Sequence, residues 1–574
     1  MRRPDRPLSP AAGQTRALAP GPDRRGRRHA GTLALLAATA ILAGSQRPVH
    51  GESPSHLLPN PYAPTTGAPA PTESEPGSSG ATGARAVPGA AARPTASADL
   101  PKPPKEPGAR REWLRSRLDE LFAAPSLSRS KVSILVVESD TGRPIYARGD
   151  KTLLNAASNV KIVTSAAALA LLGPEYRWKT TTLVASPPQG SPLRSGGELT
   201  GDLYVRGAGD PMLTTEDLSG MVADLAAVGL HRIRGGIVVD ETFFDAAHVG
   251  PAYDQKSDSY ASRAPSSATS LNGNVVAVTI VPANAAGAAA RVVIEPASPY
   301  FTLSGRVVTA TDGPVGPTVE TASDNGGHTR VIVTGRVRLG SEPRTFLRRV
   351  VEPPLYLGWT LKQLLERRGI SVAKGVRVGP APAQGARVLS AHESPPLGVV
   401  VHDLNKRSNN FAAEQVLRTL GAEIVGRPGS WERGIEAVSR YLTNSAGLRR
   451  GSYQMTNGSG LYDSNRFSAE QIVAVLRAAQ RDFRISAEFL ASLAVAGTDG
   501  TIAHRMASTL AERYVRAKTG TLAGTSCLSG FAGSPGDIPL VFSFIMNDLA
   551  NPGEARRTQD RAAELLVAYL EGPP

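Results

Sequence analysis

Residues 155–172 combine a serine–lysine pair with a long apolar run, and the rest of the chain can be organised around this stretch. The apolar positions between Ile162 and Leu172 follow overlapping helical spacings, which predicts a largely buried helix. Ser158 and Lys161 stand three residues apart where this pattern begins, so their side chains share one helical face. A serine needs a base within hydrogen-bond reach to act as a nucleophile, and a lysine becomes that base when burial or another cation lowers its pKa. The alternative is a serine N-cap followed by a solvated lysine.

Two further short motifs follow the serine–lysine pair along the chain. The first is Ser408-Asn409-Asn410, which lies after a predicted loop at 405–407 and before a predicted helix. The second is Lys518-Thr519-Gly520, between two predicted strands near the C-terminus. Each motif alone is weak, but their order and structural context raise the signal well above chance.

Chance matches to these motifs also occur. Ser128 and Lys131 form a second Ser-x-x-Lys, which runs into a strand pattern rather than a helix. Ser270-Leu271-Asn272 is a second Ser-x-Asn, and it also leads into a strand. A single short motif is therefore weak evidence for a catalytic site, and only the three motifs in this order indicate one.

Hydrophobic periodicity divides the chain from residue 111 onward into alternating and helical stretches. A helix is predicted at 114–122 and a hairpin of two strands at 132–147. Strand patterns then dominate 176–395, with a helix near 361–367, and helices return at 411–420 and 431–442. Strands at 514–517, 526–531 and 540–546 and a helix at 554–570 close the chain. The two ends are predicted to share one sheet.

The first 110 residues have a different character. Residues 1–30 hold eight arginines against two aspartates, and residues 31–44 are apolar but shorter than a membrane-spanning helix. We interpret 1–44 as a secretory signal peptide with a long arginine-rich n-region; the alternative is an uncleaved anchor. Residues 45–110 are rich in Pro, Ala, Gly and Ser and are interpreted as a disordered linker. The sequence thus predicts an exported protein of the periplasm or cell envelope, in contact with membrane only if the signal is retained.

Composition excludes several classes of function. The net charge is +14, but about six of these charges fall in the first 30 residues, and no basic helix or basic patch interleaved with aromatics suggests nucleic acid. The nine histidines show no metal-like spacing, so no metal or other cofactor is predicted. Cys527 is the only cysteine, which rules out an intramolecular disulfide, and its strand position predicts a small buried hydrophobe.

With its three motifs in this order, the sequence resembles the penicillin-recognising serine enzymes. Lys161 and Ser408 are 247 residues apart, which implies a large insert between the first and second motifs. That pattern is similar to the D-alanyl-D-alanine carboxypeptidase/endopeptidase family of penicillin-binding protein 4 type, the low-molecular-mass class C penicillin-binding proteins. Further stretches that match the family are residues 207–211, 236–240, 270–274, 457–461, 496–501 and 518–522.

The resemblance covers about 111–574 and implies an α+β fold. A β-lactamase/transpeptidase-like domain, an antiparallel sheet flanked by helices, would comprise 111–175 and 396–574. Two small β-rich inserted domains would occupy 176–395. The implied substrates are peptidoglycan peptides with D-Ala-D-Ala or D-Ala-diaminopimelate bonds, and β-lactam antibiotics would acylate the enzyme.

The family also implies a role for each motif residue. Ser158 would be the acylated nucleophile and Lys161 its base, while Ser408 would relay a proton to the leaving amine. Asn410 would hold the substrate's peptide carbonyl and orient Lys161, and Lys518 would keep the site positive. Lys518, Thr519 and Thr521 would bind the terminal carboxylate, and Gly520 would let the strand pass close to the substrate. Backbone N–H groups of Ser158 and Thr521 would form the oxyanion hole.

Two departures from the family pattern concern substrate preference. Asn457 stands where the family often has Asp, and Tyr462 stands where a polar residue follows Gly-Leu. Asn457 and Asp499 are interpreted as turn formers rather than catalytic residues.

Two alternative functions remain open at this point. One is a serine β-lactamase or esterase on the same fold, although Glu414 and Glu432 lie on predicted helices rather than in a loop that could activate water. The other is an inactive peptidoglycan-binding protein.

Overall fold

The computed structural model describes residues 102–185, 193–194, 196–314, 316–535 and 538–570. The predicted signal peptide and most of the predicted linker therefore lie outside the described residues. Helix α1 (Pro107–Phe122) begins seven residues before the predicted start at 114, because Pro107 occupies its first turn and the Glu106 carboxylate caps it. That carboxylate accepts hydrogen bonds from the N–H groups of Gly108 at 3.0 Å and Ala109 at 2.6 Å.

A six-stranded antiparallel sheet joins the two ends of the described chain, as predicted. Its strand order is β2-β1-β25-β24-β23-β22. The strands are β1 (Lys131–Glu138), β2 (Pro144–Arg148), β22 (Ala494–Val495), β23 (Val515–Leu522), β24 (Thr525–Ala532) and β25 (Leu540–Asn547). Residues 518–520 thus lie inside β23, whereas the sequence placed them between two strands.

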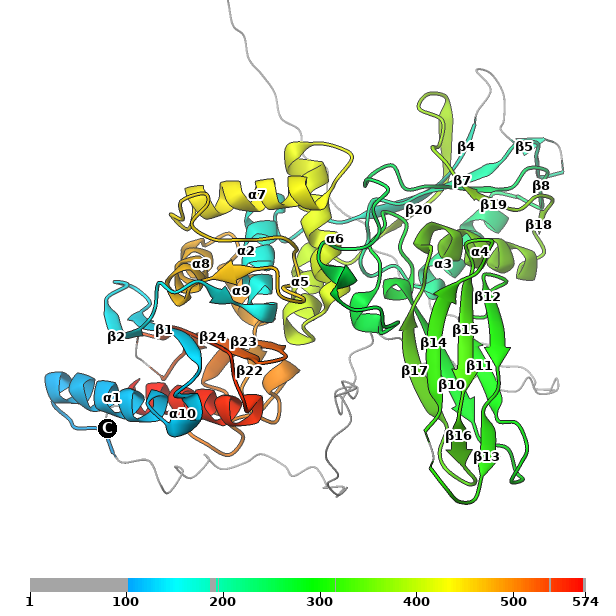
Figure 1. The fold of residues 1–574 in the computed structure, drawn as a ribbon. Coiled ribbons are helices and arrows are strands. Elements are labelled where there is room, and N and C mark those ends of the chain that lie inside the picture. Colours follow the sequence, from blue (N-terminus) through cyan, green and yellow to red (C-terminus); the bar gives the residue numbers. More distant parts are fainter. Residues whose placement is uncertain (1–101, 186–192, 195, 315, 536–537, 571–574) are drawn as a thin grey trace, which may run out of the picture. The chain divides into compact units, whose positions relative to one another are not determined.

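Both faces of this sheet are buried, and side chains alternate between them along each strand. In β1, Leu135 and Val137 pack into one core, whereas Ile134 and Val136 pack into another. The second core is closed by α1 and α10 (Pro552–Leu570), which lie side by side below the sheet in Figure 1. Full burial of side chains such as Leu114, Leu118 and Phe122 of α1 stabilises this layer by about 1.5–3 kcal/mol each.

The other face carries α2 (Val160–Leu172) and helices from the last third of the chain. These are α5 (Leu397–Lys406), α6 (Asn410–Leu420), α7 (Trp431–Asn444), α8 (Ala469–Arg481) and α9 (Ser486–Ser492). Helix α2 contacts α5, α6, α7 and α8, so it is the central helix of this layer. Helices and an antiparallel sheet therefore form the predicted α+β arrangement.

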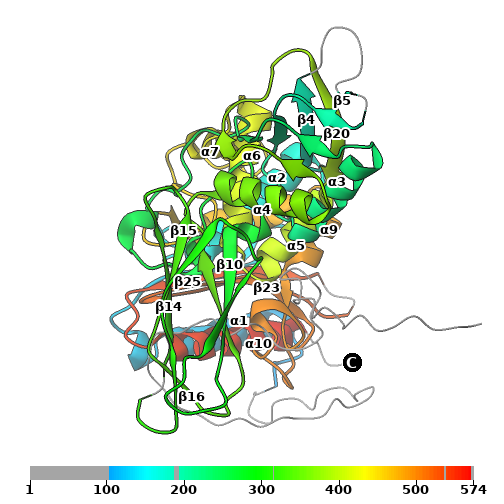
Figure 2. The same cartoon turned by 90° about the vertical axis from the view of Figure 1, so that its right-hand side faces the viewer.

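The region between α2 and α5 is rich in strands, as predicted, and is drawn mainly in green in Figures 1 and 2. One five-stranded sheet has the order β19-β9-β7-β4-β20, and two three-stranded sheets have the orders β11-β10-β17 and β12-β15-β14. Helices α3 (Thr215–Ala227) and α4 (Pro353–Arg367) belong to the same region. The principal strands are β4 (Lys179–Ala185), β7 (Leu203–Arg206), β9 (Ile237–Asp240), β10 (Val275–Val281), β11 (Arg291–Glu295), β12 (Phe301–Gly305), β14 (Thr318–Ser323), β15 (Thr329–Thr334), β17 (Arg344–Arg349), β19 (Val376–Val378) and β20 (Ala386–Glu393).

A buried arginine links this β-rich region to α6. Arg418 is fully buried, and its guanidinium donates to the carbonyl of Ser266 at 2.8 Å and to the carboxylate of Asp245 at 2.7 Å. The same guanidinium lies over the rings of Phe244 and Trp431. The division into an enzyme domain at 111–175 and 396–574 and two inserted domains at 176–395 stays a prediction.

Among the helices of the described ranges, none is both long enough and apolar enough to cross a membrane.

Candidate active site

Ser158 lies in a short 3₁₀ turn, Ala157–Asn159, immediately before α2 rather than in the first turn of that helix. Ala157 has a left-handed φ of 44°, and its N–H is held by the Asn155 side chain at 2.9 Å. On the other side, the Asn159 amide donates to Ser529 Oγ of β24 at 2.5 Å. The turn that carries Ser158 is therefore tied to the sheet, and Ser158 itself stays partly accessible.

Lys161 lies beneath Ser158 and is fully buried. Its Nζ lies 3.1 Å from Ser158 Oγ, 2.7 Å from Asn410 Oδ1 and 2.6 Å from the backbone carbonyl of Ser459. A neutral amine has two N–H groups and one lone pair. The two carbonyl oxygens accept the N–H groups, which leaves the lone pair for the hydroxyl of Ser158. This arrangement suits a lysine that takes a proton from serine.

Burial favours that neutral form of the amine. Desolvation, and secondly the like charge of Lys518, lower the pKa of Lys161 well below its ordinary value, whereas the negative charge of Glu414 acts in the opposite direction. The structure therefore provides both causes that the sequence analysis named for an activated lysine.

Ser408 sits between α5 and α6 with a left-handed φ of 57°. Asn405 and Lys406 belong to α5, so the predicted loop at 405–407 is shorter than the sequence suggested. The Asn409 side chain caps α6 by accepting from Ala412 N–H at 3.1 Å, and this starts the helix at Asn410. The tight junction brings the Ser408 hydroxyl and the Asn410 amide to the same site as Lys161.

Lys518 approaches from β23 and is also fully buried. Its Nζ donates to Ser408 Oγ at 2.8 Å and to the carbonyl of Thr519 at 2.9 Å. Burial lowers the pKa of Lys518 to about 7. Strand β22 pairs only with Arg516 and Ala517, so residues 518–520 lie on the open edge of the sheet.

Thr519 and Thr521 are two residues apart on β23, so their side chains project from the same face of the strand. Thr519 is partly accessible and Thr521 is exposed, and Thr519 Oγ1 donates to Thr501 Oγ1 at 2.8 Å. Both side chains thus lie near the edge of the sheet, and that of Thr519 is hydrogen-bonded to Thr501.

Gly520 passes directly over the turn that carries Ser158. A Cβ at this position would lie 2.9 Å from the carbonyl oxygen of Ala156 and 3.1 Å from both Ala157 Cβ and Cys527 Cβ. The close approach of β23 to Ser158 therefore requires glycine. Cys527 is buried in β24 as predicted, and its burial raises the pKa of the thiol to about 12.

The chance motif matches have different surroundings. Ser128 is exposed and donates to the carbonyl of Pro125 at 2.8 Å. Ser270 donates to the carbonyl of Ser267 at 2.8 Å, inside the β-rich region. The structure brings together Ser158, Lys161, Ser408, Asn410 and Lys518 and does not add these two serines to them.

Asn457 and Asp499 form local hydrogen bonds of the kind expected for turn formers. Asn457 Oδ1 accepts from Gly460 N–H at 2.9 Å, and Asp499 Oδ1 accepts from Val495 N–H at 2.8 Å. Asp499 also pairs with Lys406 at 2.5 Å. Both side chains shape the backbone near the site.

Sequence reasoning gave no part in the site to the backbone carbonyl of Ser459 or the hydroxyl of Tyr253, and it considered the carboxylate of Glu414 only as a water-activating group. The Ser459 carbonyl accepts directly from Lys161, but a motif specifies side chains and so cannot reveal a backbone group. Glu414 follows Asn410 by one helical turn, which is the only signal in the sequence that could have indicated it.

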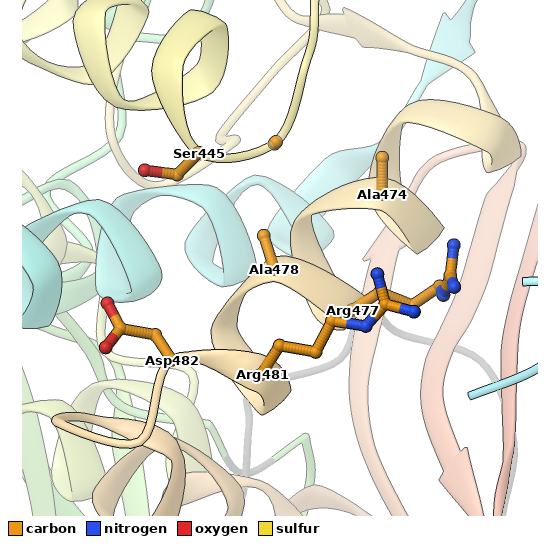
Figure 3. A pocket seen from close by; sticks show the side chains of 7 residues that line it. Ser445, Ala474, Arg477, Ala478, Arg481 and Asp482 are labelled. Carbon is orange, nitrogen blue, oxygen red and sulfur yellow. The ribbon is translucent and has the colours of Figure 1, made fainter. Parts of the chain in front are cut away.

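A hollow of about 330 Å³ lies elsewhere, where the end of α7 meets α8. Figure 3 shows its lining, which includes Ser445, Arg477, Arg481 and Asp482. No lysine is among the described residues that line it, so it lacks the serine–lysine pairing found at Ser158. Among the described residues, the serine–lysine pair at Ser158 thus lies outside this hollow.

Comparisons with known proteins agree with this geometry. The model of the D-Ala-D-Ala carboxypeptidase 3 (S13) family matches residues 114–569. A D-alanyl-D-alanine carboxypeptidase of Actinomadura sp. (strain R39) is 34% identical over 475 residues, which cover 80% of this chain and 86% of the relative. The D-alanyl-D-alanine carboxypeptidase DacB of Haemophilus influenzae is 26% identical over 405 residues, which cover 70% of this chain and 82% of the relative.

The fold has a counterpart among solved structures. Penicillin binding protein 4 (dacB) from Haemophilus influenzae superposes with a TM-score of 0.67 at 23% identity, over 77% of this chain and 98% of that protein. A second structure of the same protein, with a TM-score of 0.63 at 23% identity over 78% of this chain and 98% of that protein, holds a β-lactam. The fold is therefore the one expected from the resemblance. The family match, together with the 34% identity to the Actinomadura enzyme, shows that the chain belongs to the D-Ala-D-Ala carboxypeptidase 3 (S13) family and is a serine-type peptidase.

Proposed function

We propose that this enzyme hydrolyses the terminal D-Ala-D-Ala bond of peptidoglycan stem peptides through an acyl-enzyme at Ser158, and that it also opens D-Ala-diaminopimelate cross-links. Ser158 Oγ attacks the scissile carbonyl while Lys161 Nζ takes its proton. The C–N bond then breaks, and the leaving amine receives a proton through Ser408. Water hydrolyses the resulting ester and releases the shortened peptide.

The observation that carries this proposal is the environment of Lys161 Nζ. Two carbonyl oxygens, Asn410 Oδ1 at 2.7 Å and Ser459 O at 2.6 Å, accept its protons, and Ser158 Oγ lies 3.1 Å away. An amine held in this way has its lone pair free for the serine proton. Backbone N–H groups of Ser158 and Thr521 would receive the oxyanion, and losing one such donor typically costs about 3 kcal/mol of transition-state stabilisation.

The carboxylate beside the scissile bond is read by β23. Lys518 supplies positive charge beneath the strand, and the hydroxyls of Thr519 and Thr521 lie on its accessible face. Charge-assisted hydrogen bonds to a carboxylate are about twice as strong as neutral ones. The same groups can hold a free terminal carboxylate or the D-centre carboxylate of a cross-link, so both substrate classes fit.

β-Lactams would acylate the same serine, because they present a reactive carbonyl next to a carboxylate. The β-lactam complex of the Haemophilus influenzae protein supports this extension. An arginine-rich segment followed by an apolar stretch at 1–44 supports export to the cell envelope, where peptidoglycan is found.

The test uses two substrates and one variant. The purified enzyme is incubated with a muropeptide pentapeptide and with a dimer cross-linked through D-Ala and diaminopimelate, and the released D-Ala and monomers are quantified. We expect turnover of both substrates by the wild type and of neither by Ser158→Ala. Turnover by the variant, or no turnover of either substrate by the wild type, would contradict the proposal.

A further inference from the structure

The two oxygen atoms that accept protons from Lys161 are themselves held in place by other residues. One is the side-chain oxygen of Asn410 and the other is the backbone carbonyl of Ser459. Their positions decide where the lone pair of the amine points. Whatever fixes these two oxygens therefore acts on the base of the reaction.

Helix α6 positions both oxygen atoms that accept from Lys161. Asn410 and Glu414 are four residues apart on α6, so their side chains lie on one face of that helix. Asn410 reaches Lys161 directly. Glu414 accepts from the N–H of Gly458 at 3.0 Å and from the N–H of Ser459 at 2.9 Å. The Glu414 carboxylate therefore hydrogen-bonds to the backbone N–H of Ser459, the residue whose carbonyl accepts from Lys161.

Glu414 is only 1% exposed, and its two oxygens are surrounded by donors. Besides the two backbone N–H groups, the Trp431 indole donates at 2.8 Å and the Tyr253 hydroxyl at 3.3 Å. Four donors match the acceptor capacity of a carboxylate and leave none of it for a substrate or a water-activating role. A glutamine at position 414 would place its NH₂ group, which is itself a donor, opposite some of these four donors, and those hydrogen bonds would be lost.

Tyr253 belongs to the β-rich region between α2 and α5 and is 2% exposed. Its hydroxyl lies 3.1 Å from Ser459 Oγ as well as contacting Glu414. Nine residues further on, the carbonyl of Ser262 accepts from the Asn410 amide at 3.0 Å, which sets the side-chain oxygen of Asn410 toward Lys161. Both acceptors of Lys161 are thus connected to one segment of the β-rich region.

We propose that Glu414 and Tyr253 are positioning residues of the acylation step, which hold the Ser459 carbonyl against Lys161 and make the β-rich region part of the machinery that orients the base. This inference rests on the roles proposed above for Ser158 and Lys161. A buried network that served folding alone would change stability when broken. A positioning network also changes the rate at which Ser158 is acylated by the folded enzyme.

The charge of Glu414 gives a second, separable effect. The charged groups that act on Lys161 are Lys518, which lowers the pKa of the amine, and Glu414, which raises it. Removing the charge of Glu414 therefore moves the acidic limb of the pH–rate profile to lower pH. Loss of positioning instead lowers the plateau of the profile, meaning the highest acylation rate that it reaches, between the deprotonation of Lys161 and the alkaline decline expected when Lys518 loses its charge.

The experiment measures the second-order acylation rate by a fluorescent penicillin from pH 5 to 9, for the folded fraction determined by active-site titration. The variants are Glu414→Gln and Tyr253→Phe. Tyr300→Phe is the matched control, because Tyr300 is also a buried tyrosine of the β-rich region whose hydroxyl accepts hydrogen bonds from Thr329 and from the N–H of Glu352. Thermal melting is recorded for all variants.

We expect the plateau to fall about tenfold in Glu414→Gln and about threefold in Tyr253→Phe, since small displacements of a reacting group are costly to rate. The acidic limb of Glu414→Gln should also move to lower pH. Tyr300→Phe should melt at a lower temperature but keep the wild-type plateau. Plateaus within about twofold of wild type in both test variants would overturn the proposal.

If Glu414→Gln does not fold, Tyr253→Phe decides alone, and an unchanged plateau in that variant overturns the proposal. Failure of the underlying function looks different. In that case the wild type itself would carry no penicillin adduct at Ser158.

Discussion

Lys518 Nζ lies 2.8 Å from Ser408 Oγ, and the charge of this lysine also lowers the pKa of Lys161. Two buried lysines therefore share one site and compete for protons. Desolvation is the larger cause of the shift at Lys161, and burial is also the main cause that lowers the pKa of Lys518 to about 7. One lysine can then be neutral while the other stays charged, which is the division of labour that the proposed reaction needs.

This pair predicts a pH dependence that differs between substrates. For a substrate with a terminal carboxylate, kcat/KM should rise as Lys161 loses its proton and fall again as pH passes about 7, where Lys518 becomes neutral. For the matched substrate amide the alkaline decline should disappear, because no carboxylate has to be bound. The measurement is kcat/KM from pH 5 to 9 at constant ionic strength. Superimposable profiles would contradict the assignment of Lys518.

Ser158→Ala should abolish labelling by a fluorescent penicillin and reduce turnover by at least about 1,000-fold, because no other nucleophile faces Lys161 in the part of the chain described here. Ser128→Ala is the matched control from the second Ser-x-x-Lys, and it should label like the wild type since Ser128 is exposed. Mass spectrometry of the adduct peptide locates the label. A penicillin adduct that persists in Ser158→Ala would refute the assignment of Ser158 as the nucleophile.

Replacing Thr519 and Thr521 with valine should slow turnover of a carboxylate-bearing substrate by about 10- to 100-fold, because a hydrogen bond to a charged group contributes about 1.5–3 kcal/mol. The matched substrate amide should lose much less. Replacing both with serine retains the hydroxyls and should restore most of the rate on the acid. Equal losses on acid and amide in the valine variant would show that β23 does not read the carboxylate.

Gly520→Ala should lower the acylation rate about tenfold or more, because the added Cβ has to push β23 away from the turn that carries Ser158. Gly220→Ala is a suitable control: Gly220 lies within α3, and a Cβ there would meet no atom within 4 Å. That control should acylate at the wild-type rate and gain slightly in stability. Wild-type acylation by Gly520→Ala would argue against the close approach.

Much of the fold follows from local patterns. The alternation in residues 132–137 and the helical spacing after Ser158 predict β1 and α2, and the strand–strand–helix ending predicts that the chain ends share a sheet. Boundaries were less predictable. Helix α1 starts early because Glu106 caps it, and residues 518–520 continue β23 because pairing with β24 extends to Leu522.

Only those residues of the site that belong to side-chain motifs could be predicted from the sequence. Ser158, Lys161, Ser408, Asn410 and Lys518 carry such motifs, and the structure brings them together. The Ser459 carbonyl lies 298 positions from Lys161 in the sequence, and Tyr253 lies 161 positions from Glu414. Contacts between such distant positions depend on how whole elements pack, which no local pattern encodes. The left-handed backbone at Ser408 is likewise set by the junction of two helices.

The pairing of β1 with β25 also has a consequence during synthesis. All of β1 pairs with β25, and the backbone N–H of Asn155 donates to the Asn547 side chain, 392 positions later, so these N-terminal elements need a strand from the C-terminal part of the described chain. Such long-range pairing is slow to form, and a domain cannot close before its final strand is available. The turn at Ala157–Asn159, whose Asn159 side chain donates to Ser529 of β24, can therefore reach its final geometry only after the C-terminal strands have emerged from the ribosome. A nascent chain that still lacks these strands therefore lacks the complete site around Ser158.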